Sequence, residues 1–195
     1  ILKKLKVNYL YLPTYKDLFK FKPSHRVYLH KFEKKLCGKY RKGHFKGVLD
    51  VVNRFLEIIR PKYLFLGLKD FQQLILIQKH ILKNKIVTKI TSCKTVREPS
   101  GVACSSRNFN LNKNQMKIAK DVFNYLIKIK KKTKKNLKLF DSTLFKKDLI
   151  KIGVNKIDYL EIINRKTLEK PKKANENFNI FIAYYLNKVR LIDNI

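Results

Sequence analysis

The stretch Arg60–Leu74 reads R-P-K-Y-L-F-L-G-L-K-D-F-Q-Q-L, and it decides the fold. Its apolar run Tyr63–Leu66 is typical of a short strand, and the pattern after Gly67 predicts a helix from Asp70 to about Leu82. Open α/β sheets bind ligands at the carboxyl ends of their strands, where such strand-to-helix turns lie. We therefore expect the turn Gly67–Asp70 to lie at a ligand-binding edge.

The segments on either side extend this α/β pattern. From His44 to Ile59, apolar residues recur at spacings of three and four, which predicts a helix with one buried face. Ile86–Thr91 is predicted as another strand. Val7–Leu12 is predicted as a buried strand stopped by Pro13, and Arg26–His30 is a candidate for a short strand.

Beyond Asn108 the pattern changes. Helices are predicted over about Lys113–Lys130 and Leu144–Lys151, and strands over Ile157–Ile163 and Phe178–Tyr185. Helices followed by strands indicate a smaller α+β domain.

A second stretch, Cys104–Asn108, reads C-S-S-R-N and follows a turn predicted at Glu98–Gly101. Lys69 of the first stretch supplies a movable point charge, whereas Arg107 supplies a planar fork that can hold two phosphate oxygens. The two serines before Arg107 add hydrogen-bond donors. Either string alone is a weak signal, but together they indicate a polyphosphate site.

Four segments of the chain resemble the pantoate-beta-alanine ligase family, the pantothenate synthetases. They occur in the family's order and extend to the last residue, so the resemblance covers essentially the whole chain. These motif segments are R-K-G-H-F-K-G-V (Arg41–Val48), the opening stretch Arg60–Leu74, T-V-R-E-P-S-G-V-A-C-S-S-R-N (Thr95–Asn108) and R-L-I-D-N-I (Arg190–Ile195).

The resemblance implies an α/β fold with two parts. Residues 1–95 are expected to be the C-terminal part of a Rossmann-like domain of the HUP nucleotidyltransferase type. Residues 96–195 are expected to form a small α+β C-terminal lid domain that includes the S-S-R-N loop. The family's H-x-G-H signature lies upstream, and none of the four histidines here has that context. We therefore expect an N-terminally truncated fragment that makes no pantothenate at a useful rate.

The implied reaction is the ATP-dependent condensation of pantoate with beta-alanine to pantothenate through a pantoyl adenylate. ATP and Mg²⁺ are the expected cofactors, and no protein side chains are expected to form a metal site. The family also implies a homodimer for the full-length protein, in the cytoplasm, with neither a nucleic acid nor a membrane as partner.

The resemblance assigns roles to individual residues. Lys69 and Arg107 are the expected catalytic residues, and Gln73 is expected to bind pantoate. Gln72 should point about 100 degrees away from Gln73 on the same helix. Arg41 and His44 are expected to support the pantoate or phosphate site. The expected ATP-binding residues are Gly67, Leu68, Lys69, Asp70, Val96, Cys104, Ser105, Ser106 and Arg107.

Finer roles follow from the same resemblance. Gly67 and Asp70 correspond to ribose contacts, and the backbone of Val96 to an adenine contact. Leu68 replaces the family's usual glutamate, which we interpret as a surface change. Cys104 replaces a methionine or leucine and is expected to pack as an apolar residue, because no histidine motif accompanies it to support a catalytic thiol.

Lysine dominates the formal net charge of +32, because only 8 of the 46 basic residues are arginine. An AT-rich coding bias explains this mixture better than selection for a polyanionic partner. Besides Arg60, four arginines nevertheless lie inside the motif segments, which indicates a use that lysine cannot serve. These are Arg41, Arg97, Arg107 and Arg190. We expect Arg190 and Asp193 to brace the end of the small domain through a salt bridge.

Three isolated cysteines without C-x-x-C spacing favour a reduced, cytoplasmic setting over a disulfide framework or a zinc site. Two other functions stay open as alternatives. One is a basic nucleic-acid-binding module, and the other is a degenerate, non-catalytic relative of the family. The intact G-x-K-D, Gln73 and S-S-R-N set argues against the second.

Overall fold

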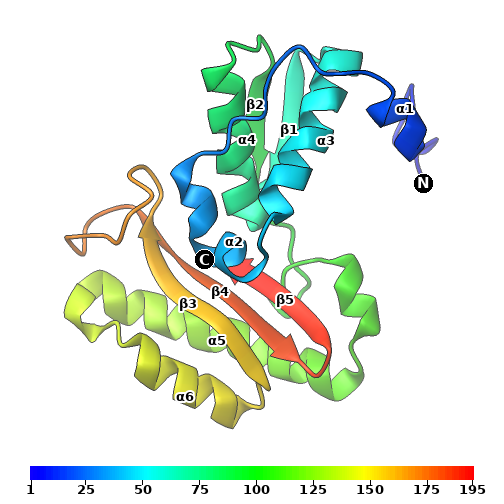
Figure 1. Cartoon of the computed structure of the whole chain (residues 1–195). Helices are drawn as coiled ribbons and strands as arrows, with labels where there is room; N and C mark the ends of the chain where they lie inside the picture. The colour runs from blue at the N-terminus through cyan, green and yellow to red at the C-terminus, as the bar shows by residue number, and fades with distance from the viewer.

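The computed structural model describes residues 1–195 and contains two separate sheets. Strands β1 (Tyr63–Gly67) and β2 (Lys89–Cys93) pair in parallel. Strands β3 (Lys156–Asn164), β4 (Phe178–Leu186) and β5 (Val189–Asn194) form an antiparallel sheet in that order. The parallel sheet lies in the upper half of the molecule and the antiparallel sheet in the lower half (Figure 1).

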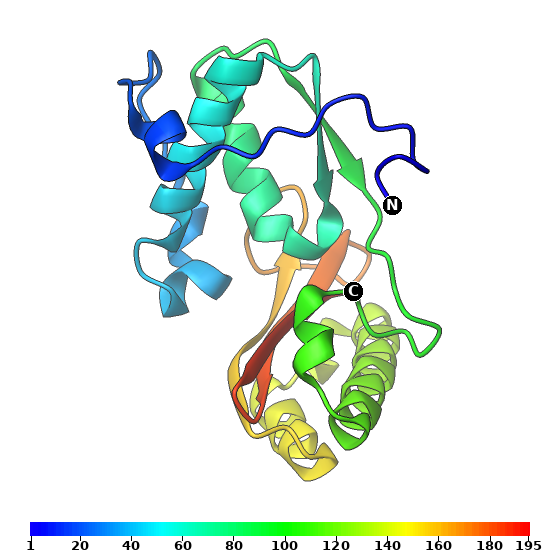
Figure 2. The ribbon, with the colours of Figure 1, turned by 90° about the vertical axis from the view of Figure 1, so that its right-hand side faces the viewer.

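Two amphipathic helices pack on one face of the parallel sheet. These are α3 (His44–Ile59) and α4 (Phe71–Lys83), and both lie on the same side of the strands (Figure 2). Their apolar faces form a buried cluster with the inward residues of the strands. The cluster is centred on Leu49, Leu56, Ile77 and Ile81, with Leu64, Leu66 and Ile90 packed against it. The strand, turn and helix order predicted at Arg60–Leu74 is therefore present.

The N-terminal region lacks the two predicted strands. Residues 7–12 are exposed, and their only backbone hydrogen bond joins the Val7 amide to the Leu2 carbonyl. An apolar run without a neighbouring strand to pair with does not form a strand, so this prediction is wrong. At Arg26–His30 the Tyr28 amide donates to the His80 ring instead of to a strand, at 3.1 Å. Short helical segments occur in this region instead: α1 (Tyr15–Phe19), a 3-10 turn η1 (Lys31–Lys34) and α2 (Leu36–Tyr40).

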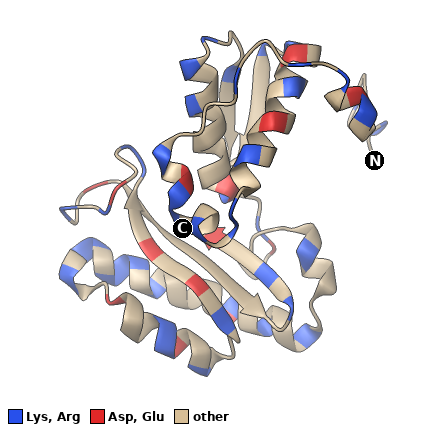
Figure 3. Cartoon of the chain, in the orientation of Figure 1, with Lys and Arg blue, Asp and Glu red and all other residues tan.

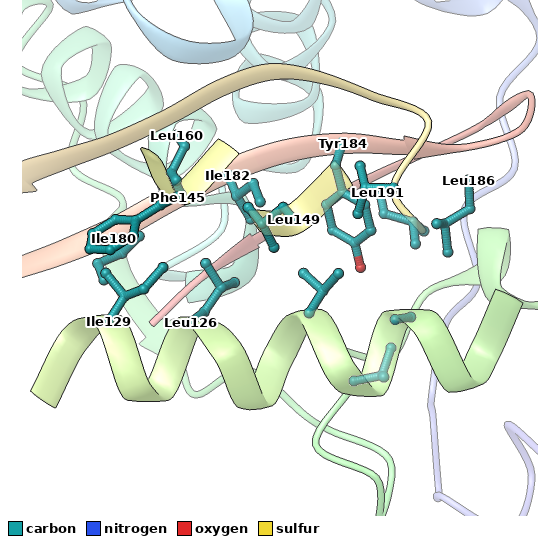
Figure 4. Close-up of a cluster of buried hydrophobic side chains, with 14 of the residues drawn as sticks. Leu126, Ile129, Phe145, Leu149, Leu160, Ile180, Ile182, Tyr184, Leu186 and Leu191 are labelled. Atoms are coloured by element: carbon teal, nitrogen blue, oxygen red, sulfur yellow. The ribbon is translucent and has the colours of Figure 1, made fainter. Parts of the chain in front are cut away.

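In the lower half, two helices pack on one face of the antiparallel sheet. These are α5 (Lys113–Lys135) and α6 (Ser142–Ile152), joined through a short 3-10 turn. Asp141 caps α6 by accepting from the amides of Thr143 and Leu144, so the helix begins two residues before the predicted start. The side chains of α5 and α6 pack against those of the sheet in a buried cluster (Figure 4), which includes Leu126, Ile129, Leu149, Ile180 and Ile182.

The opposite face of the antiparallel sheet packs against the upper half. Tyr159 and Phe181 from the sheet join Phe32, Leu36 and Phe71 in a second buried cluster. The sheet is therefore covered on both faces. This packing brings the end of β5, a strand that the sequence pattern did not predict, against the turn that follows β1. No helix has the length and apolar character needed to cross a lipid bilayer.

Candidate active site

The turn after β1 presents Lys69 between the two halves of the molecule. A 3-10 turn, η2 (Leu68–Asp70), connects Gly67 to α4. Asn194, the last residue of β5, donates its side-chain amide to the carbonyls of Leu68 and Lys69, at 2.9 and 3.0 Å. The antiparallel sheet therefore holds the backbone of a turn that belongs to the parallel sheet.

The S-S-R-N loop reaches Lys69 from the other side. A 3-10 turn, η3 (Ser106–Asn110), is capped by Ser105, whose hydroxyl accepts from the Arg107 amide at 3.2 Å. Arg107 is exposed, and its guanidinium donates to the carbonyl of Arg190 at 3.2 Å. Lys69, Ser105 and Arg107 line one pocket, which we call the phosphate pocket. The structure therefore brings together two stretches that lie far apart in the sequence.

Arg97 fixes the stem of this loop. Its guanidinium pairs with both carboxylate oxygens of Asp193, at 2.7 and 2.9 Å, and also donates to the carbonyls of Gly101 and Asn194. Such a bidentate pair stabilises the contact between Arg97 and Asp193 and also fixes the orientation of both side chains. Gly101 has a φ of +88° and lies so close to Phe123 that a Cβ there would be 2.1 Å from the ring. The predicted turn at Glu98–Gly101 is present, with the Gly101 amide bonded to the Glu98 carbonyl.

A second pocket shares Lys69 and lies against the starts of α3 and α4. We call it the acceptor pocket; among its lining residues are Arg41, His44, Asp70 and Gln73. Gln72 also lines it but is 5% exposed, and its amide nitrogen donates to the carbonyls of Phe32 and Lys35 at 2.8 and 2.7 Å. Of the two adjacent glutamines, Gln72 therefore anchors the chain upstream, which leaves Gln73 available to a ligand.

His44 is held as a neutral ring at the start of α3. Burial lowers its pKa below the ordinary value, and the charges of Arg41, Arg190 and Arg107 lower it further. The Nη1 of Arg41 lies 2.8 Å from its Nε2. Because a guanidinium can only donate, Nε2 acts as the acceptor and the ring proton is on Nδ1.

A buried network that the sequence did not reveal lies behind the acceptor pocket. Arg190 donates from Nε to Asp158 at 2.8 Å, and both its Nη atoms lie within 3.8 Å of the Cys37 sulfur. The Cys37 sulfur also lies 3.0 Å from the Tyr159 hydroxyl. Arg190 and Asp193 are thus both ion-paired, but with Asp158 and Arg97 and not with each other. Only the presence of arginine in the motif segments indicated this network.

Five of the expected nucleotide contacts line neither pocket: Gly67, Leu68, Val96, Cys104 and Ser106. Leu68 is not a simple surface change, since it is half-buried and packs against the second core cluster. The Val96 side chain is 73% exposed, so it does not belong to a strand core. Burial and the neighbouring Glu98 raise the pKa of the Cys104 thiol, so the thiol stays protonated.

Together, the parallel β-α-β layer, the antiparallel sheet beside it and the cationic pockets at their junction define a nucleotidyltransferase-like α/β protein with a small C-terminal domain. This is the fold class predicted from the sequence. A model of the pantoate-beta-alanine ligase family matches residues 1–195, and the chain belongs to this family.

Curated relatives agree with this assignment. Pantothenate synthetase of Flavobacterium psychrophilum is 35% identical over 193 residues, which cover 95% of this chain and 67% of that protein. The enzyme of Thermosipho africanus is 32% identical over 198 residues, which cover 100% of this chain and 70% of that protein. The chain therefore corresponds to somewhat more than two thirds of each relative.

Solved structures resemble the whole chain. Pantothenate synthetase from Thermus thermophilus matches with a TM-score of 0.88 and 25% identity, covering 100% of this chain and 71% of that one. A pantoate-beta-alanine ligase from Francisella tularensis, complexed with beta-gamma ATP and beta-alanine, matches with a TM-score of 0.77 and 33% identity. The match covers 100% of this chain and 66% of that one.

Proposed function

We propose that this chain carries the phosphate-binding half of an enzyme that condenses pantoate with beta-alanine at the expense of ATP. The observation that carries the proposal is the convergence of Lys69, Ser105 and Arg107 on one pocket from two separate segments, the turn after β1 and the loop before α5. A neighbouring pocket with Gln73 and Arg41 shares the same lysine. The Francisella tularensis relative, whose structure contains beta-gamma ATP and beta-alanine, supports the choice of substrates.

The proposed reaction has two steps. The pantoate carboxylate attacks the α-phosphorus of ATP and pyrophosphate leaves; the beta-alanine amine then attacks the acyl carbon of the adenylate and AMP leaves. Negative charge accumulates on the phosphate oxygens in the first step. Lys69 and Arg107 act by offsetting that charge with donors that are already in position. Gln73 orients pantoate from the adjoining pocket.

We infer that magnesium enters this site together with the phosphates of the nucleotide. No group of three or more His, Cys, Asp or Glu side chains is arranged to hold a metal ion. Mg²⁺ is commonly held by one or two carboxylates together with substrate phosphates, and Asp70 is a carboxylate lining the acceptor pocket. The bound ion would neutralise phosphate charge.

Other roles belong to the same proposal. Asp70 is exposed beside Lys69 and suits a ribose hydroxyl, with Gly67 allowing close backbone approach because nothing lies within 4 Å of a Cβ built there. The exposed Val96 suits an adenine contact through its backbone. We also propose a domain boundary near residues 95 and 96, a homodimer for the full-length protein, and a cytoplasmic location consistent with three free cysteines.

The lysine excess does not favour a nucleic-acid site. Lysine and arginine are spread along the helices and strands of both halves (Figure 3). The densest run, Lys128–Lys138, covers the C-terminal end of α5, where the helix dipole by itself favours lysine, so this run does not require a polyanionic partner.

Two measurements test the proposal. The first is ATP binding to the 195-residue chain by isothermal titration calorimetry, with Lys69→Ala expected to weaken it and the exposed Lys120→Ala expected to leave it unchanged. The second is pantothenate formation from ATP, pantoate and beta-alanine. Any pantothenate that the unmodified chain forms should decrease in Lys69→Ala. Undiminished ATP affinity in Lys69→Ala would contradict the proposed phosphate site.

A further inference from the structure

The end of β5 contacts both segments that face the phosphate pocket. Asn194 is 6% exposed and uses every polar atom of its side chain. Its Nδ2 donates to the carbonyls of Leu68 and Lys69, and its Oδ1 accepts from the amide of Asn179 on β4 at 2.8 Å. Its own carbonyl accepts from Arg97, which holds the stem of the S-S-R-N loop, at 3.2 Å.

We propose that Asn194 is a positioning residue for Lys69, and that it sets where this lysine lies relative to Arg107. The inference rests on the proposed function, since it assumes that Lys69 binds phosphate. Asn194 itself does not line either pocket, so it acts through the backbone of the turn and not through the ligand.

The turn depends on this support because it has few local constraints. It is a single 3-10 turn, and neither Gly67 before it nor Asp70 at the start of α4 provides a side-chain cap. Asn194 bonds to two consecutive carbonyls of the turn from a different sheet. A displacement of Lys69 by about 1 Å would matter, because charge stabilisation of this kind depends on donors placed in advance.

The chemistry of the position explains why it is an asparagine. A side-chain amide offers two hydrogens from one nitrogen, one for each carbonyl, together with an oxygen for Asn179. Aspartate has the same shape but would place a carboxylate against two carbonyl oxygens. Alanine would leave both carbonyls without this donor. The bond from Asn179 also fixes which end of the Asn194 amide faces the turn.

Strand β5 supports the two halves of the pocket through different contacts. Arg107 donates to the Arg190 carbonyl and Arg97 pairs with Asp193. Of the two segments that face the pocket, the Asn194 side chain contacts only the Lys69 turn. Loss of the Asn194 amide should therefore affect the Lys69 half and leave the Arg107 half in place. This selectivity distinguishes a positioning role from a general contribution to stability.

A double-mutant cycle on ATP affinity tests the proposal. Calorimetry with MgATP would compare the unmodified chain, Asn194→Ala, Lys69→Ala and the double variant. We expect Asn194→Ala to weaken binding by about tenfold in the unmodified chain, but by less than about twofold when Lys69 is already alanine. Asn194→Asp should weaken it at least as much as Asn194→Ala. The exposed Asn114→Ala serves as the matched control and should bind normally.

The outcomes separate this proposal from the proposed function. Absence of MgATP binding by the unmodified chain would contradict the function and this role together. Normal binding by Asn194→Ala, or an equal loss with and without Lys69, would contradict only the role of Asn194. Thermal unfolding would accompany each titration. If Asn194→Ala does not fold, Asn179→Ala retains the Asn194 amide but removes its brace, and it should give the same pattern with a smaller loss.

Discussion

Acid should destabilise this protein through one buried histidine. His80 on α4 is fully buried, and its Nδ1 lies 3.1 Å from the Tyr28 amide nitrogen, which can only donate to it. Its Nε2 lies 3.0 Å from Oδ1 of Asn53, whose amide nitrogen donates to the His25 carbonyl at 2.7 Å. The ring is therefore neutral, with its proton on Nε2, and it ties α3, α4 and the N-terminal segment together.

The magnitude follows from the change in pKa on folding. Burial, with a smaller contribution from His25, lowers the pKa of His80 from 6.5 to about 4. The unfolded chain therefore takes up a proton first as the pH falls, and the neutral ring favours folding fully only above the unfolded pKa. The loss in the free energy of unfolding should reach about 2 kcal/mol at pH 5 and about 3 kcal/mol at pH 4.

Urea unfolding followed by far-ultraviolet circular dichroism, between about pH 7.5 and pH 5, measures this loss. His80→Gln should be less stable at neutral pH but should lose about 2 kcal/mol less on acidification than the unmodified chain. Four carboxyl groups also have lowered pKa values, but they titrate in both proteins and cancel: Asp17, Glu57, Glu169 and Glu176. His30→Gln is the matched control and should retain the His80 component. Equal acid sensitivity in His80→Gln and the unmodified chain would refute the reasoning.

Three further predictions concern the site and the core. Arg107→Lys removes the fork, so MgATP affinity should fall about ten- to hundredfold in calorimetry, whereas Arg60→Lys should bind normally. Gly38→Ala would place a Cβ 1.6 Å from the Glu33 carbonyl oxygen, so the free energy of unfolding in urea should drop by about 2 kcal/mol or more. Leu149→Ala, at a fully buried position on α6, should cost about 2 to 5 kcal/mol in the same assay, and a change below 1 kcal/mol would contradict the packing described for that core.

Local patterns predicted most of the elements because these elements depend on local periodicity. Helix α3 occupies His44–Ile59 as predicted, since its apolar spacing matches a single buried face. Strand β2 begins at Lys89 and not at Ile86, because the Ile86 amide bonds back to the Ile81 carbonyl and the Thr88 hydroxyl to the Pro61 carbonyl. Strand ends are thus set by contacts with other segments, which a window of sequence does not contain.

The site was predictable only as separate parts. The sequence identified the lysine turn and the S-S-R-N loop, but not the strand that connects them. Strand β5 is short, and its pairing with β4 depends on a hairpin in which Asn187 has a φ of +51°. The contacts of Asn194 with Leu68 and Lys69 span more than 120 residues of sequence. No periodicity encodes a contact of that range.

Several arginines in this lysine-rich chain make internal contacts that lysine could not make, and only some of them lie at the proposed site. Arg97 holds a carboxylate with both prongs, and Arg190 lies between Asp158 and Cys37, so neither could be replaced by a point charge. Arg54 lies outside the motif segments, yet it too donates to two backbone carbonyls and stacks on Phe19. Arginine in this chain therefore indicates a position where one side chain must contact several acceptors at once, whether in the core or in the site. Of the arginines in the motif segments, Arg60 and Arg107 are exposed, and each donates one hydrogen bond to a backbone carbonyl. Only Arg107 lines the phosphate pocket with Lys69. Because its guanidinium fork has no carboxylate partner and lies in the phosphate pocket with Lys69, Arg107 is the arginine for which a ligand is the best explanation.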